Sequence, residues 1–212
     1  MKNTHQVHLS SQFTRRTLAA ALSVLLLGPA LCANALAQTW PSKPIKVVVN
    51  FPPGGAADQI ARAVGIPLAE ALGQPVVIEN RGGANGNLGG DLVAKSAPDG
   101  HTLLLTDNSF VMAAGLYPRL PFDPQKDFAP LAHIGTASYV LMIHADVPAK
   151  NAAEFIRYAK ANPGKLNIGT PQIGTTQNLS AEYFLSASGL QAQIVPFNGT
   201  PPVITACSSL GL

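Results

Sequence analysis

The sequence predicts an α/β protein built on parallel strands, and three observations support this fold class. The β-branched apolar run Ile45–Phe51 stops at the turn-forming residues Pro52–Gly55, which is typical of a buried strand. Further short apolar runs alternate with helical patterns along the chain. Twice, a strand is followed by a loop of small residues and then by a helix, and these two strands end at residues 51 and 169. Open α/β sheets bind ligands where such loops gather.

The elements of the first half follow in order from this pattern. Apolar residues recur at helical spacing between Ile60 and Leu72, and Gly73 ends the helix, while Gly65 and Pro67 are expected to kink it or split it in two. We then expect a strand at Pro75–Glu79, a short helix near Leu88–Lys95 and a strand at Thr102–Thr106.

The second half begins after a Pro-rich passage. Its expected elements are one or two strands within Phe128–Ile143, a helix at Ala152–Ala161, a strand at Leu166–Gly169, a helix at Asn178–Ser188 and a strand at Gln193–Phe197. We place a first α/β domain at residues 38–140 and a partial second one at residues 141–212.

Residues 1–37 have the pattern of a secretory signal peptide. The pair Arg15-Arg16 precedes the apolar run Leu18–Leu27, and the small-x-small site at Ala35–Ala37 predicts cleavage before Gln38. The pattern predicts a periplasmic protein, and both the Sec and the twin-arginine (Tat) routes are open.

Charge and cysteine content exclude some classes of protein. The formal net charge of +3 is accounted for by Lys2, Arg15 and Arg16, so the chain beyond residue 37 is balanced and nothing favours a nucleic-acid partner. Cys32 lies within the signal, which leaves Cys207 without an intrachain partner. We expect a monomer whose stability comes from its core.

The first candidate binding loop lies between the first strand and the first helix. Its candidate residues are Phe51, Pro52, Pro53, Gly54, Gly55 and Asp58. Glycines allow a ligand to approach the backbone closely, and the amide groups of the helix start attract an anion such as a carboxylate. Asp58 would fix the loop or meet an amino group. The alternative is a tight turn in which Asp58 complements the helix dipole.

The second candidate loop adds hydroxyl and amide groups but no charge. Its candidate residues are Thr170, Gly174, Thr175, Thr176, Gln177 and Asn178, which suit neutral hydrogen bonds to carboxylate oxygens. The alternative is a capped helix start with Thr175 or Thr176 as N-cap. Asn108 and Ser109 end a strand and either face the ligand or belong to an Asx turn with Asp107.

Signatures of catalysis and of cofactors are weak. The Gly-rich stretch from Asn80 to Gly90 lacks the ending of a phosphate-binding loop and the dinucleotide spacing, although Arg81 could hold a ligand acid. The histidines have no metal-ligand spacing, and no Gly-x-Ser-x-Gly elbow is present. We therefore predict no cofactor, no metal and no enzymatic activity, with an exported hydrolase as the remote alternative.

Several of these segments together resemble the Bug (TctC-type) receptors of tripartite tricarboxylate transporters. The resemblance rests on Trp40–Ile45, the Phe51–Asp58 loop, Leu72–Arg81, Pro98–Leu104, the Leu120–Phe128 passage and Gly169–Asn178, in the family's order. It implies a periplasmic-binding-protein-like, type II flytrap fold whose two loops clamp a small carboxylate. The implied ligands are di- and tricarboxylates, acidic amino acids or similar acids, and the implied partner is a membrane permease.

Two departures from the family pattern stand out. Asn178 replaces a usual histidine, and Arg81-Gly82-Gly83 replaces the usual Arg-Pro-Gly. Members of the family are also about half as long again, and the tail Ala206–Leu212 fits no family pattern. We therefore expect an architecture that is incomplete at its C-terminus, resembling a frameshift or truncation product, and a non-functional receptor fragment is the alternative to a working receptor.

Overall fold

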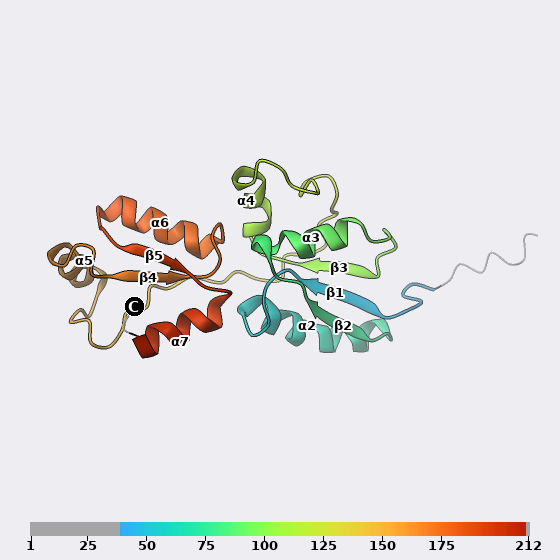
Figure 1. Ribbon diagram of the computed structural model, residues 1–212. Helices are drawn as coiled ribbons and strands as arrows, with labels where there is room; N and C mark the ends of the chain where they lie inside the picture. Colours follow the sequence, from blue (N-terminus) through green and yellow to red (C-terminus); the bar gives the residue numbers. More distant parts are fainter. Residues whose placement is uncertain (1–38, 211–212) are drawn as a thin grey trace, which may run out of the picture. The chain divides into compact units, whose positions relative to one another are not determined.

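The computed structural model describes residues 39–210, and its elements alternate between strand and helix (Figure 1). The predicted signal peptide and its cleavage site lie outside the described residues. From Lys43 onward the described chain forms one compact unit that contains two parallel sheets. Within residues 39–210, no helix has the length and apolar character needed to cross a membrane.

The first sheet has three parallel strands in the order β2-β1-β3. Strand β1 (Ile45–Val49) pairs with β2 (Val76–Asn80) on one side and with β3 (Thr102–Leu105) on the other. The central strand is buried along most of its length, as expected for an apolar run between two neighbours. Parallel pairing confirms the α/β prediction.

Helix α2 (Ala56–Leu72) packs against β1 and β2 and is continuous. Of the two expected effects of Gly65 and Pro67, a kink or a split of the helix, the split is therefore wrong. Pro67 lies on the exposed side of the helix, where water can satisfy the carbonyl group that loses its amide partner. Gly65 is buried, and a Cβ atom there would lie 3.4 Å from Ile78 Cδ1, so glycine allows the helix to approach β2 closely.

The opposite face of the first sheet is covered by α3 (Asn87–Ala94), which follows the single 3-10 turn η1 (Ala84–Gly86). Helix α4 (Ser109–Leu116) was not expected from the sequence. It begins where Asp107 Oδ1 accepts a hydrogen bond of 2.8 Å from the Ser109 amide, which is the predicted Asx turn. Phe110 of this helix stacks on Phe122 with ring centroids 5.3 Å apart and anchors the passage that follows.

Residues 128–150 contain no helix and no strand, so the strands predicted within Phe128–Ile143 are wrong. A strand is held by hydrogen bonds to a neighbour, and in the described part of the chain this segment pairs with none. Several of its apolar side chains remain exposed, with 76% of Leu131 and 77% of Val140 accessible to solvent. An apolar run favours a strand only where a partner strand and a covering layer exist.

The second sheet consists of β4 (Asn167–Thr170) and β5 (Gln193–Pro196), which are parallel. Helix α5 (Ala152–Ala161) precedes it with the predicted bounds, and Asn151 caps this helix. Helices α6 (Thr176–Ser188) and α7 (Thr200–Leu210) lie on opposite faces of the sheet (Figure 1). The buried core on one side comprises Phe155, Ala159, Leu185 and Leu190. The predicted boundary between domains at residues 140 and 141 remains a prediction.

Candidate functional site

The loop Phe51–Asp58 is shaped by one glycine and one carboxylate. Gly54 has φ +81°, a conformation that side chains rarely adopt, and its amide donates a hydrogen bond of 2.9 Å to Asp58 Oδ2. Helix α2 begins immediately afterwards, and its N-cap residue Gly55 offers no side chain to the first amide groups. These amides have no partner within the helix, so the start of α2 can bind an anion.

Asp58 supports this loop from inside, through contacts with Gly54 and Arg62. The side chain is buried, and its Oδ1 lies 2.9 Å from Arg62 Nη2 one turn later in α2. The hydrogen bond from Arg62, together with that from the Gly54 amide, lowers the pKa of Asp58 below its usual value. The carboxylate is therefore ionised, and its charge is balanced within the loop.

The loop Thr170–Asn178 repeats this geometry with uncharged groups. Gly174 has φ +85°, and its amide donates to Asn178 Oδ1 at 3.0 Å, while Asn178 Nδ2 donates to Thr170 Oγ1 at 3.1 Å. Thr175 is the N-cap of α6, and its hydroxyl group accepts from the Asn178 amide at 3.3 Å. Thr170, Thr175 and Asn178 are buried and bonded to one another, so they fix the shape of the loop.

Ser109 joins the second loop to the end of the first sheet. Its hydroxyl oxygen accepts a hydrogen bond of 3.1 Å from the Thr176 amide and lies 3.3 Å from Thr176 Oγ1. Ser109 is completely buried, whereas Asn108 is exposed. Of these two candidates, the structure brings Ser109 to the second loop.

The first loop lies beside the segment that connects β5 to α7. A Cβ atom on Gly54 would lie 3.5 Å from Pro201 Cγ, and one on Gly199 would lie 3.3 Å from Pro52 Cγ. The side chains of Phe51 and Pro52 are half-buried, and Pro53 is exposed. Gln177 is also half-buried. Whether these candidates touch a ligand remains a prediction.

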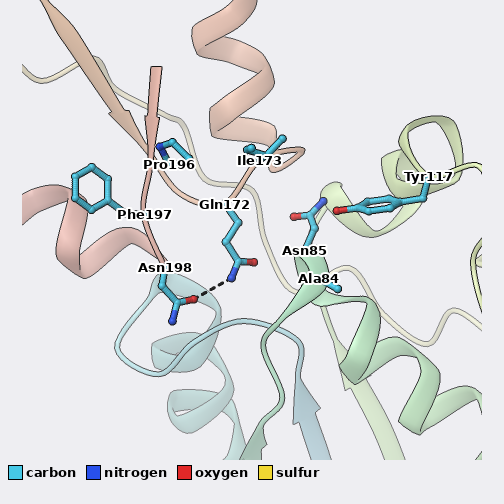
Figure 2. A pocket seen from close by; sticks show the side chains of 8 residues that line it. All are labelled: Ala84, Asn85, Tyr117, Gln172, Ile173, Pro196, Phe197 and Asn198. Atoms are coloured by element: carbon cyan, nitrogen blue, oxygen red, sulfur yellow. Dashed lines mark hydrogen bonds between the residues drawn. The ribbon is translucent and has the colours of Figure 1, made fainter. Parts of the chain in front are cut away.

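A cavity of about 460 Å³ that opens widely to solvent lies next to the second loop (Figure 2). Its polar side chains are Asn85, Tyr117, Gln172 and Asn198, and its apolar ones are Ala84, Ile173, Pro196 and Phe197. Gln172 Nε2 donates to Asn198 Oδ1 at 2.9 Å, which ties the end of β4 to the end of β5. None of the eight lining residues is charged.

None of the lining residues is among the predicted site residues, although Gln172 and Ile173 lie within the second loop. The sequence does contain a signal for the segment after β5. Asn198-Gly199-Thr200-Pro201 is a further transition from strand to helix, with a proline where helices commonly begin. Asn85 and Tyr117 carry no such signal, because folding alone brings them to the cavity.

The candidate residues lack the arrangement of a hydrolytic or metal site. The Ser109 hydroxyl group contacts Thr176, and the Ser109 backbone amide donates to Asp107, so in the described chain no histidine is among these hydrogen-bond partners. Within residues 39–210, no three His, Cys, Asp or Glu side chains form a group that could hold a metal ion. Backbone amides at two helix starts and neutral side chains suit the binding of a small anion.

Comparison with known proteins assigns this arrangement to a family. Residues 60–209 match the model of the tripartite tricarboxylate transporter family receptor. A UPF0065 protein of Pseudomonas sp. (strain P51) is 35% identical over 191 residues, which are 90% of this chain and 56% of the relative. Protein BugT of Bordetella pertussis (strain Tohama I) is 34% identical and is matched over 88% of this chain and 58% of its own length. The chain thus spans about half the length of the curated relatives it matches.

Solved structures give the same result for the fold. The periplasmic binding protein BugD superposes with a TM-score of 0.69 at 30% identity, over 79% of this chain and 56% of that one. MatC from Rhodopseudomonas palustris, with bound malate, has a TM-score of 0.70 at 34% identity over 79% and 57%. A second R. palustris protein, with adipate, has a TM-score of 0.70 at 30% identity over 79% and 56%. The likeness confirms the predicted periplasmic-binding-protein-like fold class.

Proposed function

Since this chain belongs to the tripartite tricarboxylate transporter receptor family, we propose that it is an exported receptor that captures a small carboxylate in the periplasm. Its partner would be a membrane permease that accepts the loaded receptor. The observation that carries the proposal is the paired geometry of the two loops. In each, a glycine amide is bonded to the side chain four residues later, immediately before the first turn of a helix.

This geometry suits a carboxylate because it orders the backbone without using the groups that a ligand needs. The bonded glycine amide fixes the loop, while the amides of the first helical turn of α2 remain available and are favoured by the helix dipole. The Asp58 charge is compensated by Arg62, so it opposes an incoming anion less than a free carboxylate would.

The chemistry of similar proteins supports the ligand class. Receptors with adipate and with malate are among the solved structures to which the chain is similar. Both ligands are small acids, and the neutral side chains around the cavity offer hydrogen-bonding groups to such a ligand.

Ligand-dependent thermal unfolding of the purified chain tests the proposal. A ligand that binds the native state raises the unfolding temperature by mass action, so malate, adipate and other small acids are added in turn. The corresponding uncharged diamides serve as control compounds. A cooperative transition that one acid shifts upward supports a working receptor, whereas a broad transition unmoved by any acid supports a receptor fragment without binding activity.

A substitution at Gly55 connects such binding to the first loop. A Cβ atom at this position has its nearest neighbour, the Pro52 carbonyl oxygen, at 3.7 Å, so a side chain fits there. Gly55→Asp would cap α2 with a negative charge and is expected to abolish binding of the acid without harming the fold. Gly55→Asn is the matched neutral control and should weaken binding less. Equal affinity of both variants and the unchanged chain would exclude the start of α2 as the anion site.

A further inference from the structure

The strongest unexplained feature of the described chain is the side chain of Asn85. It is 3% exposed, yet neither Oδ1 nor Nδ2 has a hydrogen-bond partner within the part of the chain that the structure describes. Buried amide groups are nearly always bonded, because leaving water without a replacement partner is costly. An unbonded amide that also lines a cavity therefore points to a partner that the cavity receives.

The backbone adopts an unfavourable conformation at this side chain. Asn85 has φ +56° and follows Ala84 at φ +47°, so two successive residues other than glycine adopt the left-handed conformation. Asparagine tolerates this conformation better than most residues do. The amide is also held near the second loop, because a Cβ atom on Gly174 would lie 3.0 Å from Asn85 Nδ2. Asn85 thus belongs to the wall that faces Gln172 and Asn198 (Figure 2).

Asn50 and Asn87 also have buried amide atoms without a partner, but neither lines the cavity. A Cβ atom on Gly86 would lie 2.3 Å from Asn50 Nδ2, so Asn50 is enclosed by backbone. Among these three residues, Asn85 is the one that lines the cavity.

We infer that Asn85 is a specificity-determining residue that binds a hydroxyl or carboxamide substituent of the captured acid. The inference rests on the proposed function, in which the loops hold one carboxylate. An amide offers a donor and an acceptor on adjacent atoms, and both are unused here. A hydroxyl or carboxamide group satisfies both, whereas a carboxylate offers acceptors only and leaves Asn85 Oδ1 unpaired.

The neighbouring groups are consistent with this selection. Gln172 Nε2 is already engaged by Asn198, and none of the lining side chains is charged, so hydrogen bonds to a substituent come from neutral groups such as Asn85. Sites built to bond a polar substituent reject analogues that lack it, because their own buried groups then stay unpaired. The selectivity of the receptor would therefore depend on Asn85 more than on the two loops.

The test compares succinate, malate and succinamate as probes, by calorimetric titration of the purified chain. Malate adds a hydroxyl group to succinate, and succinamate replaces one carboxylate by a carboxamide. We expect malate or succinamate to bind at least about tenfold more tightly than succinate, the size of effect expected for a substituent whose loss leaves a buried group unpaired.

Asn85→Gly removes the amide while keeping a residue that tolerates positive φ, so the fold is retained. This variant should bind the favoured probe, malate or succinamate, about tenfold more weakly and succinate with little change, so that the preference over succinate disappears. Ala84→Gly is the matched control, because it relaxes the neighbouring left-handed residue without removing a polar group, and it should keep the preference. A preference that survives Asn85→Gly, or equal weakening of all three probes, would overturn the inference while leaving the proposed function standing. Failure of the unchanged chain to bind any acid would overturn both.

Discussion

The loops Phe51–Asp58 and Thr170–Asn178 achieve the same backbone geometry with different chemistry. Each has a glycine of positive φ whose amide is bonded to the third residue of the following helix, Asp58 in one and Asn178 in the other. The first loop uses a carboxylate and therefore needs Arg62 to balance it. The second uses an amide and needs only Thr170. The requirement at this position is an acceptor of suitable reach, and its charge is secondary.

The groups bonded to Asp58 and those bonded to Asn178 also differ in their access to water. Gly174 and Thr170 are buried, whereas Gly54 is exposed and the Arg62 side chain is 56% exposed. Groups released in the first loop can therefore be hydrated, and those released in the second cannot. This difference predicts how strongly each loop responds to substitution.

The largest effect is expected for Asn178→Leu. The substitution leaves the Gly174 amide and the Thr170 hydroxyl without a partner in a buried environment, which should lower the free energy of unfolding by about 3 kcal/mol. Asp58→Leu should cost about 1 to 2 kcal/mol, because Gly54 and Arg62 gain water in exchange. Urea denaturation of both variants measures the difference. Equal losses would show that burial does not distinguish the two loops.

Alanine at the two glycines should produce the next largest effect. A left-handed conformation costs a residue other than glycine about 1 to 2 kcal/mol at either position. In Gly174→Ala the new Cβ atom would also lie 3.0 Å from Asn85 Nδ2 and from Leu116 Cδ1, whereas at Gly54 the nearest atom is 3.5 Å away. Thermal unfolding should therefore rank Gly174→Ala as the less stable variant. Gly73→Ala, with φ +64° and no atom within 4 Å, is the control for the conformation alone.

A smaller effect is expected at the helix caps. Thr175 caps α6 through its hydroxyl group, whereas Gly55 provides no side-chain cap to α2. Thr175→Ala should cost about 1 kcal/mol, whereas Gly55→Ser should raise stability by a few tenths of 1 kcal/mol, because it supplies the missing side-chain cap. Chemical denaturation is again the measurement, and a cost at Gly55 as large as that at Thr175 would contradict the assignment of caps.

The smallest effect should be seen in the pH dependence of Asp58→Asn. The folded-state pKa of Asp58 is lowered from 3.8, so the ionised group stabilises the fold above pH 3.8, and this contribution is lost as the pH falls through the folded-state pKa. Asp58→Asn should lose about 0.5 to 1 kcal/mol at neutral pH. The difference from the unchanged chain should shrink in acid. Asn178→Leu should retain the acid sensitivity of the unchanged chain, and a constant deficit in Asp58→Asn would refute the role of the charge.

Local patterns predicted the parts of the fold that depend on local chemistry. Helix α5 has the predicted bounds because Asn151 caps it and Pro163-Gly164 follows it, and both signals are written in the sequence. The segment Phe128–Ile143 was predicted wrongly, because pairing requires a neighbour that a sequence pattern cannot supply. Pro67 was also expected to have a stronger effect on α2 than it has. The destabilisation by a proline inside a helix depends on whether water can reach the carbonyl group that loses its amide partner, and Pro67 lies on the exposed face.

Some features of the candidate site could likewise be predicted from local sequence patterns, and others could not. The loops of small residues after β1 and β4 were visible as composition, and Thr175 was one of the two residues predicted as N-cap. The sequence left open whether Asp58 fixes the loop or meets an amino group of a ligand. Its contacts with Gly54 and Arg62, which show that it fixes the loop, could be seen only in the structure. Asn85 and Tyr117 were missed because they reach the cavity from distant parts of the chain.

The uncharged lining of the cavity has a consequence for the speed of capture. Long-range electrostatic attraction accelerates the encounter of charged partners and weakens steeply as salt is added. With no charged lining residue, and with Asp58 and Arg62 cancelling one another, little such attraction acts on a diffusing acid. For the proposed receptor, the association rate constant should therefore be nearly independent of ionic strength, so that an acid would be bound at the same rate when the salt concentration changes.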